Sequence, residues 1–461
     1  MSDAAGFRAL PSVDRLAGAE GASALVARYG RAAVVDAARD AIDAARESLK
    51  RGQPAPDADA LLNQMAVRLH AQFAPTLRPV INATGVIIHT NLGRAPLSDE
   101  AARAVSDIAS QYNTLEYNLE AGARGSRLLH ADVLLREITG AEAALVVNNN
   151  AAALVLLLSA LAQGRGVIIS RGQLVEIGGG FRVPEVMEQS GAVLIEVGAT
   201  NRTRPSDFTQ AISHPRPYHP PAAMLMRAHA SNFKQIGFTE EVSLAEMSAI
   251  AHAHGLLCVD DLGSGALLDT AAYGLEHEPT VQESLAAGCD LVAFSADKLL
   301  GGPQAGILAG KKAIIDVLKR HPLARAVRAD KLCLAGLSAT LEHYRRGEAI
   351  EKIPVWRMMA LSADAIRAQA ASWAELLGPG ASVVESESTV GGGSLPGATL
   401  PTFCLALDGP SPNTLAARLR ACDTPIIARV QDDRLLLDPR TVLPGQAEAL
   451  LAGLRAALSG G

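Results

Sequence analysis

Seven short apolar runs between residues 144 and 309 constrain the fold of this chain more than any other feature. They lie at residues 144–147, 167–170, 193–197, 223–226, 256–259, 291–294 and 306–309. Most are separated by helix-like segments or long loops. Continuous apolar strands that alternate with helices are typical of a parallel-rich sheet covered on both faces. The pattern therefore predicts one large α/β domain.

The segments on either side of this pattern predict two further domains. Before residue 79, apolar residues recur at helical spacing, as at 22–49, and Asp57 is placed to cap a second helix that runs to about residue 73. A long helical run at 337–377 precedes strands near 403–407 and 434–437, with a glycine-rich break at 391–394 between them. We expect a helical domain over residues 1–78, the large α/β domain over 79–336 and a small α+β domain over 337–461.

Composition narrows the class of protein. The 461 residues are 49% hydrophobic and 20% charged, which is typical of a folded chain with a large core. Five scattered cysteines predict free thiols, a reducing compartment and no metal site. We see no signal peptide and no bilayer-spanning run, so we expect a cytoplasmic protein without a membrane partner. A net charge of −6 indicates no general affinity for DNA, although a local basic patch could still bind RNA.

The strongest chemical signal is the segment FSADKLLGGP at residues 294–303. It predicts a strand end, a polar turn that presents Ser295 and Lys298, and glycines after the turn. Enzymes that use pyridoxal phosphate (PLP) need an amine fixed at such a place, with a pKa lowered by burial or nearby positive charge. Taken alone, the motif favours an ordinary surface lysine over a cofactor lysine.

A second signal lies about forty residues upstream, in CVDDLGSG at 258–265. PLP enzymes use an aspartate to keep the pyridine nitrogen protonated, so that the ring acts as an electron sink. Asp260 and Asp261 both qualify, and we choose Asp261 because it abuts Leu-Gly-Ser-Gly. A helix N-cap is the alternative role for this residue.

A third signal is the triplet Asn148, Asn149 and Asn150, between the first strand and an apolar helix. A helix N-terminus attracts phosphate, and asparagine side chains add donors, so we expect this triplet to bind the cofactor phosphate. Simple helix capping is the alternative, although one asparagine would satisfy it. All three signals lie at carboxyl ends of strands, where open α/β sheets bind ligands, and together they favour a PLP site.

These segments, and others along the whole chain, resemble the bacterial selenocysteine synthases, which are L-seryl-tRNA(Sec) selenium transferases. Further matching segments are LPSVDRL at 10–16, HTNLGR at 89–94, RGSR at 124–127 and HPLARAVRAD at 321–330. The resemblance implies a fold-type-I PLP-dependent transferase with a mostly parallel seven-stranded sheet. It also implies a homo-oligomer built as a decamer-like ring of dimers.

The resemblance further implies a reaction and roles for particular residues. L-seryl-tRNA(Sec) would become L-selenocysteinyl-tRNA(Sec) with selenophosphate as donor, through a PLP-bound dehydroalanyl-tRNA intermediate. Lys298 matches the family's cofactor lysine, and Arg94, Arg325 and Arg328 match arginines that hold the selenium-donor anion. The N-terminal helical segment matches the part of the family that grips tRNA.

Several side chains keep two interpretations. Arg127 reaches the cofactor phosphate of a neighbouring subunit or forms a salt bridge within its own subunit. Glu176 lies where related enzymes place a residue against the cofactor ring, or it is structural. His89 and His229 are core groups or catalytic groups.

Two alternative functions also stay open. One is a PLP-dependent lyase that acts on a small amino acid or an amino-sugar acid, since such relatives share the core. They generally lack the N-terminal helical domain that this chain has. The other is a non-catalytic RNA-binding scaffold that kept the fold.

Overall fold

The computed structural model describes residues 9–177, 180–408 and 411–459, so the first eight residues of the predicted helical domain lie outside the description. Internal contacts divide the chain into two compact units, Met1–Pro79 and Val80–Gly461. None of the helices in the described ranges combines the length and the apolar character needed to cross a membrane.

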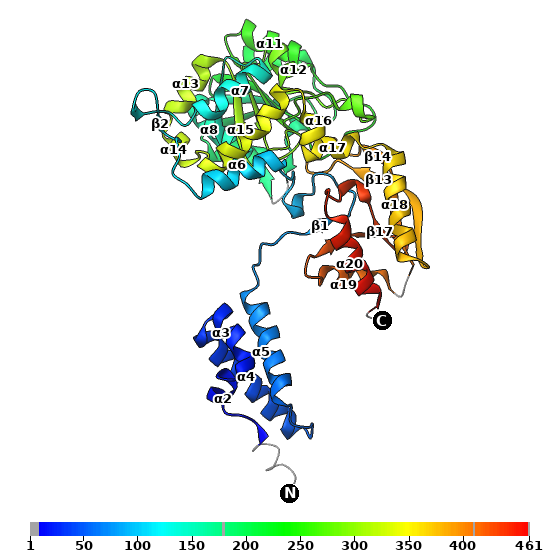
Figure 1. Cartoon of the computed structure of the whole chain (residues 1–461). Helices are drawn as coiled ribbons and strands as arrows, with labels where there is room; N and C mark the ends of the chain where they lie inside the picture. The colour runs from blue at the N-terminus through cyan, green and yellow to red at the C-terminus, as the bar shows by residue number, and fades with distance from the viewer. Residues whose placement is uncertain (1–8, 178–179, 409–410, 460–461) are drawn as a thin grey trace. The chain divides into compact units, whose positions relative to one another are not determined.

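Helices α2 (Val13–Ala17), α3 (Ser23–Tyr29), α4 (Arg31–Lys50) and α5 (Ala58–Phe73) form the first unit (Figure 1). Buried aliphatic side chains, among them Ile42 and Leu61, form its core. Asp57 caps α5 as predicted, because its carboxylate accepts a hydrogen bond of 2.8 Å from the Ala60 N–H. The helical stretch expected at 22–49 is divided at Gly30, whose φ of +85° suits glycine.

The centre of the second unit is a seven-stranded sheet, which confirms the predicted α/β class. In sequence order its strands are β4 (Ala143–Val147), β5 (Gly166–Ser170), β8 (Val193–Val197), β9 (Ala222–Ala228), β10 (Leu257–Gly263), β11 (Leu291–Ser295) and β12 (Gly306–Gly310). Their order across the sheet is β4-β12-β11-β10-β9-β5-β8. Only β12 runs antiparallel to its neighbours, so β4, β11, β10 and β9 end at the same edge.

Both faces of this sheet are buried, which explains why its strands are continuously apolar. On β4, Ala144 and Val146 belong to one core, together with side chains of α7 (Leu129–Thr139), α11 (Leu244–Ala253) and α15 (Lys331–Arg345). Leu145 and Val147 belong to the opposite core, with α8 (Asn150–Leu161) and α13 (Lys312–Arg320) (Figure 1). The sheet edge between these two helical layers is where the predicted site residues converge.

The C-terminal part of this unit is an antiparallel sheet in the order β13-β14-β17-β16, with helices packed against it. Its strands are β13 (Ala381–Thr389), β14 (Thr399–Leu407), β16 (Arg429–Gln431) and β17 (Arg434–Leu437), and its helices include α18 (Ala363–Leu377), α19 (Pro412–Arg420) and α20 (Ala447–Ser459). A short strand from the start of the unit, β1 (Ile81–Asn82), pairs in parallel with β15 (Ile426–Ile427), and Ile81 lies in the same core. The chain thus reaches this C-terminal part before it enters the large sheet.

The expected helical run at 337–377 is correct in type but not continuous. It comprises most of α15, then α16 (Ala349–Lys352), α17 (Pro354–Ala360) and α18. Gly347 adopts a φ of +70°, and Pro354 begins a new helix because proline cannot donate a backbone hydrogen bond within one. These breaks allow the chain to turn between the two sheets.

We predict that Asp57→Ala weakens α5 by about 1 kcal/mol, because the first turn loses its side-chain acceptor. Amide hydrogen exchange in α5 should become about fivefold faster, measured by mass spectrometry on the full chain. Asp59→Ala is the matched control, since Asp59 is exposed in the same turn and is not the N-cap residue. Equal exchange in both variants would show that the cap contributes no stability.

Candidate active site

Lys298 lies three residues beyond the end of β11 and is buried, with 6% of its surface exposed. Burial lowers the pKa of its amine below the usual value, and the positive charge of Arg94 lowers it further, although Asp261 opposes this shift. Two glycines border the amine: a methyl group on Gly263 would lie 3.8 Å from Nζ, and one on Gly393 would lie 3.4 Å away. An amine without its proton at this edge is suited to attack an aldehyde.

The two consecutive aspartates of β10 have different partners. Asp260 accepts hydrogen bonds of 2.7 Å from Nε and Nη2 of Arg227 and one of 2.7 Å from Ser284. Asp261 instead accepts a bond of 2.9 Å from Nδ2 of Asn150, at the start of α8. Because neighbouring side chains on a strand point to opposite faces, only Asp261 points to the face that carries α8. Burial raises the pKa of Asp261 to about 6, although the hydrogen bond from Asn150 and the positive charge of Lys298 both lower it.

The asparagine triplet has more than one structural role. Asn149 caps α8 by accepting a bond of 2.8 Å from the Ala152 N–H, which is the alternative that the sequence left open. Asn150 is engaged with Asp261, and the backbone N–H of Asn148 donates to the carbonyl of Val327. The N-terminus of α8 therefore lies beside Asp261, at the edge where a phosphate would bind.

Arg94 and Ser295 are close to Lys298 along the same edge. Arg94 Nη1 forms a 2.7 Å ion pair with Oδ2 of the buried Asp297, the residue that precedes the lysine. Its φ of +62° is unusual for a residue with a side chain and indicates a backbone held by its surroundings. Ser295 is the buried last residue of β11 and pairs with Gly306 of β12.

Arg325 and Arg328 lie in another place, in and just after α14 (Pro322–Ala326). They line a pocket of about 500 Å³ whose other basic residues are Arg124, Arg127, Lys319 and Arg320. Neither Arg94 nor Lys298 is among the lining residues, so this pocket contains two of the three predicted anion-binding arginines.

Arg127 and Glu176 both make contacts that match the plainer of their two interpretations. Arg127 donates from Nε to Glu116 at 2.8 Å and from Nη1 to the carbonyl of Ala329 at 3.0 Å, all within one chain. Glu176 begins β6 (Glu176–Ile177), and its half-exposed carboxylate pairs with Nε of Arg182 at 2.7 Å. These are contacts within one chain, and the cofactor-binding roles of Arg127 and Glu176 stay predictions.

Near Lys298, the sequence left His229 with two interpretations and did not single out its neighbour Glu278. His229 follows β9 directly, and its Nδ1 lies 3.7 Å from Oε1 of the buried Glu278. The position of His229 at a strand end was a usable signal. Glu278 gave none, because it comes from a loop that only the fold brings to this edge.

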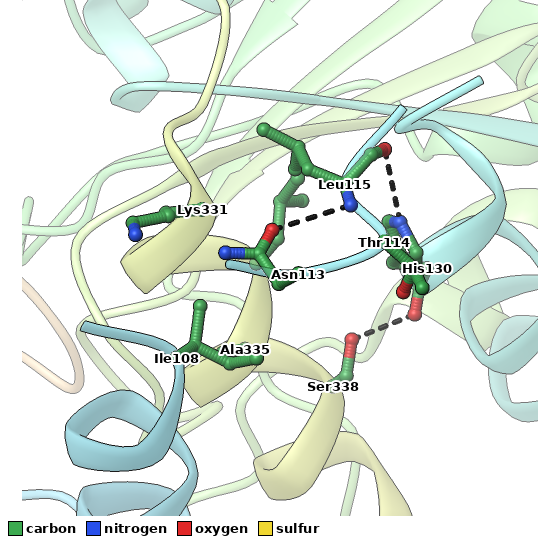
Figure 2. Close-up of a pocket in the computed structure, with 9 residues that line it drawn as sticks. Ile108, Asn113, Thr114, Leu115, His130, Lys331, Ala335 and Ser338 are labelled. Carbon is green, nitrogen blue, oxygen red and sulfur yellow. Dashed lines mark hydrogen bonds between the residues drawn. The ribbon is translucent and has the colours of Figure 1, made fainter. Parts of the chain in front are cut away.

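A separate pocket of about 230 Å³ contains none of the predicted site residues (Figure 2). It is lined by Ile108, Asn113, Thr114, Leu115, His130, Lys331, Leu334, Ala335 and Ser338. Backbone and side-chain hydrogen bonds occupy several of its polar groups, including Ser338 Oγ, which donates to the carbonyl of His130. We assign this pocket no part in the chemistry.

The residues around Lys298 fit a flat, polar cofactor. A buried amine and a buried carboxylate lie on the same edge, and Gly263 and Gly393 border the amine without side chains of their own. Within the described residues, the buried Oδ1 of Asn150 and the hydroxyls of Ser264 and Ser394 have no hydrogen-bond partner, as expected where a ligand supplies one. The part of the chain that the structure describes contains no cluster of three or more His, Cys, Asp or Glu that could hold a metal ion.

Comparison with known proteins agrees with this fit. A family model described as L-seryl-tRNA selenium transferase matches residues 80–443, and one described as selenocysteine synthase N terminal matches residues 7–46. The L-seryl-tRNA(Sec) selenium transferase of Geobacter sulfurreducens is 46% identical, over 97% of this chain and 98% of its own length. The enzyme of the same name from Solidesulfovibrio magneticus is 49% identical, over 95% of each chain.

Among solved structures, a D-glucosaminate-6-phosphate ammonia-lyase is similar in fold, with a TM-score of 0.57 and 21% identity over 85% of this chain and 98% of that one. The sheet and the lysine edge define an enzyme of the fold-type-I, PLP-dependent class. More particularly, the chain belongs to the L-seryl-tRNA(Sec) selenium transferase family, because one family model covers most of its length and relatives match it nearly end to end.

We predict that Lys298→Ala abolishes covalent attachment of PLP. Borohydride reduction of the wild-type protein, followed by peptide mass spectrometry, should place the pyridoxyl group on Lys298, because its amine is buried beside Asp261. Lys234→Ala is the matched control, since Lys234 is half exposed and paired with Glu276 at 2.6 Å. A pyridoxyl group on any other lysine would refute this assignment.

We predict that Asn150→Leu weakens cofactor binding about tenfold, because Asp261 loses a buried hydrogen-bond donor. The donation from Asn150 lowers the pKa of Asp261, so its loss raises that pKa. Asp261 is ionised above its pKa, and the defect should therefore grow as the pH falls toward 6 and shrink as it rises. Titration of apo-protein with PLP by absorbance at several pH values measures this. Asn63→Leu, at an exposed position on α5 and outside the compact unit that contains the proposed site, should bind normally.

Proposed function

We propose that this chain converts L-seryl-tRNA(Sec) to L-selenocysteinyl-tRNA(Sec) with selenophosphate as the selenium donor. The observation that carries the proposal is the near end-to-end match to relatives that bear this enzyme's name, in a chain with a buried lysine at the expected place. The lyase alternative has weaker support, since the ammonia-lyase of known structure is only 21% identical and supports the fold alone. We expect the reaction to take place in the cytoplasm.

In this proposal the residues around Lys298 divide the chemistry. Bound PLP supplies an electron sink for charge that develops at the serine α-carbon. Lys298 would hold the cofactor through its amine and would take the α-proton of the serine substrate. Asp261 keeps the ring nitrogen protonated, and Asn150 holds Asp261 in position. The N-terminus of α8, with Asn148 and Asn149, receives the phosphate group.

The selenium donor is a tetrahedral anion, which guanidinium groups bind through paired hydrogen bonds. Arg325 and Arg328 line a pocket rich in basic side chains, and Arg94 lies beside Lys298. We propose that these two places form one donor site only when subunits associate, with the pocket of one subunit next to the lysine of another. A single chain cannot supply the complete site in that arrangement.

The surface next to that pocket supports association with a second copy of the chain. Five exposed apolar residues lie between residues 112 and 133, within and on both sides of the hairpin formed by β2 (Tyr117–Asn118) and β3 (Ala123–Arg124); they are Tyr112, Tyr117, Leu119, Leu129 and Val133. Exposed apolar clusters are typical of protein interfaces. Glu116, Arg124 and Leu128 of the same segment line the basic pocket, so an interface here would border it. The ring of dimers remains a proposal from the family.

The N-terminal unit is the proposed tRNA-binding part. On α4, Arg39, Arg46 and Lys50 each pair with an acidic residue three positions earlier, so the helix is not a simple cationic face. We expect contacts to RNA phosphates from basic residues with fewer acidic neighbours, because a side chain already paired with a carboxylate releases few counterions from the RNA. The match of residues 7–46 to the N-terminal family model is the main support for this role.

We predict that Arg325→Ala raises the KM for selenophosphate by about 10- to 100-fold, because a charged hydrogen-bonding pair is lost. The absorption band of bound PLP should be unchanged, since Arg325 does not line the Lys298 region. Arg136→Ala is the control, because Arg136 is half exposed and pairs with Asp132 on α7. Unchanged selenophosphate kinetics in Arg325→Ala would refute the anion-binding role.

We predict that removal of residues 1–79 abolishes binding of seryl-tRNA(Sec) but leaves PLP binding intact, because the cofactor residues all lie in the second compact unit. Gel-shift titration with the charged tRNA measures the first effect, and PLP absorbance measures the second. Undiminished tRNA affinity of the truncated protein would overturn the proposed role of the N-terminal unit.

A further inference from the structure

The partly buried His229 and the buried Glu278 form a pair that the proposed function does not yet use. His229 follows β9, and Glu278 lies in the loop between η4 (Thr270–Tyr273) and α12 (Val281–Ala286). Nδ1 of the imidazole and Oε1 of the carboxylate are 3.7 Å apart. Both atoms are buried, and neither has a hydrogen-bond partner within the described residues.

Hydrogen bonds from the backbone fix both residues in place, whereas the facing side-chain atoms have no hydrogen-bond partner among the described residues. The His229 N–H donates to the carbonyl of Asp261 at 2.9 Å, which ties the histidine to the cofactor strand. The Glu278 N–H donates to Oγ1 of Thr270 at 2.9 Å. Because an unpaired polar atom in the interior costs free energy, such a pair is expected where a substrate or a moving proton supplies the missing partner.

The pair lies beside Lys298. Glu278 is among the charges that act on the pKa of the Lys298 amine. His229 and Glu278 also line a pocket of about 230 Å³ together with Leu395, two residues after the Gly393 that borders Lys298 Nζ. The pocket therefore lies next to a segment that borders Lys298, although Lys298 itself is not among the residues that line it.

The proposed reaction needs a proton donor that has not been assigned. Hydroxide is a poor leaving group, so the serine β-hydroxyl must receive a proton as its bond to Cβ breaks. Lys298 is engaged at the α-proton, and arginine does not give up its proton in proteins. Histidine can donate one near neutral pH, and a carboxylate at one ring nitrogen orients the other nitrogen toward the reacting group.

We propose that His229, oriented by Glu278, protonates the departing serine hydroxyl. The proposal rests on the proposed function. The imidazolium keeps its Nδ1 proton toward Glu278 and gives its other proton to the hydroxyl oxygen, so the Cβ–O bond breaks and water leaves. The electron pair left at Cα when Lys298 removes the α-proton forms the Cα–Cβ double bond. His229 then regains a proton from water in the pocket.

The neighbouring charges define the expected pH dependence. The ionisable groups that line the pocket or adjoin the pair are Lys234, Glu241, Glu276, His277, Asp261 and Lys298. Lys234 is paired with Glu276, and His277 with Asp269 and Glu283, so these are partly neutralised. The donor must carry a proton, so we expect hydroxyl loss in the wild type to become slower at high pH.

The test separates two steps of the reaction with the full-length holoenzyme and seryl-tRNA(Sec). Exchange of the serine α-proton with solvent deuterium reports on Lys298, and formation of selenocysteinyl-tRNA reports on the whole sequence. We expect His229→Gln to slow product formation about 100-fold. It should leave α-proton exchange and the PLP absorption band within about twofold of wild type. His254→Gln, at an exposed position after α11, should match wild type in both assays.

Thermal unfolding of the apo-protein supplies a readout apart from activity. Glu278→Gln removes a buried charge that lacks a hydrogen bond, so its Tm should be equal to or higher than that of wild type, while a purely structural pair would lose stability. Normal product formation by His229→Gln would overturn the proposal. So would loss of α-proton exchange or of the PLP band in that variant, because His229 would then hold the cofactor. If wild type exchanges no α-proton of seryl-tRNA(Sec), the proposed function itself is wrong, and the inference fails with it.

Discussion

The active-site region depends on the burial of one amine, that of Lys298, at the carboxyl edge of a sheet covered on both faces. Water is excluded there, which lowers the pKa of the lysine and raises that of Asp261 to about 6. The charged forms of Lys298 and Asp261 would each be energetically unfavourable at this depth without the other and without the hydrogen bond from Asn150. The glycines near Nζ are explained by the same buried amine, because a side chain at position 393 would fill the space beside it.

Strand geometry divides the polar residues near this edge between structure and chemistry. Asp260 and Asp261 are neighbours in sequence, yet one is held by Arg227 and Ser284 and the other faces α8. The same separation applies to the arginines. Arg94 lies beside Lys298, whereas Arg325 and Arg328 line a basic pocket next to an exposed apolar surface. A donor site shared between subunits would reconcile that separation with the proposed role of all three arginines.

Much of the fold could be predicted, because apolar continuity and capping are local properties of a chain. All seven strands of the large sheet lie where the apolar runs predicted them, and Asp57 caps α5. The continuous helices expected at 22–49 and 337–377 are divided, since Gly30, Gly347 and Pro354 each impose a backbone conformation that the apolar pattern did not reveal. The pairing of β1 with β15 is a contact across more than three hundred residues and left no local signal.

The sequence by itself determined the class of fold, the family and the identity of the buried lysine, because each depends on residue type and order along the chain. Only the tertiary structure decided which aspartate faces Lys298. It also showed that Asn149 caps a helix while Asn150 bonds to Asp261. Arg127 and Glu176 form ion pairs within the chain, which the sequence left open. The tertiary structure also brought Glu278 to His229. These outcomes depend on which face of a strand or helix a side chain occupies and on which loops meet at a sheet edge, and packing sets both.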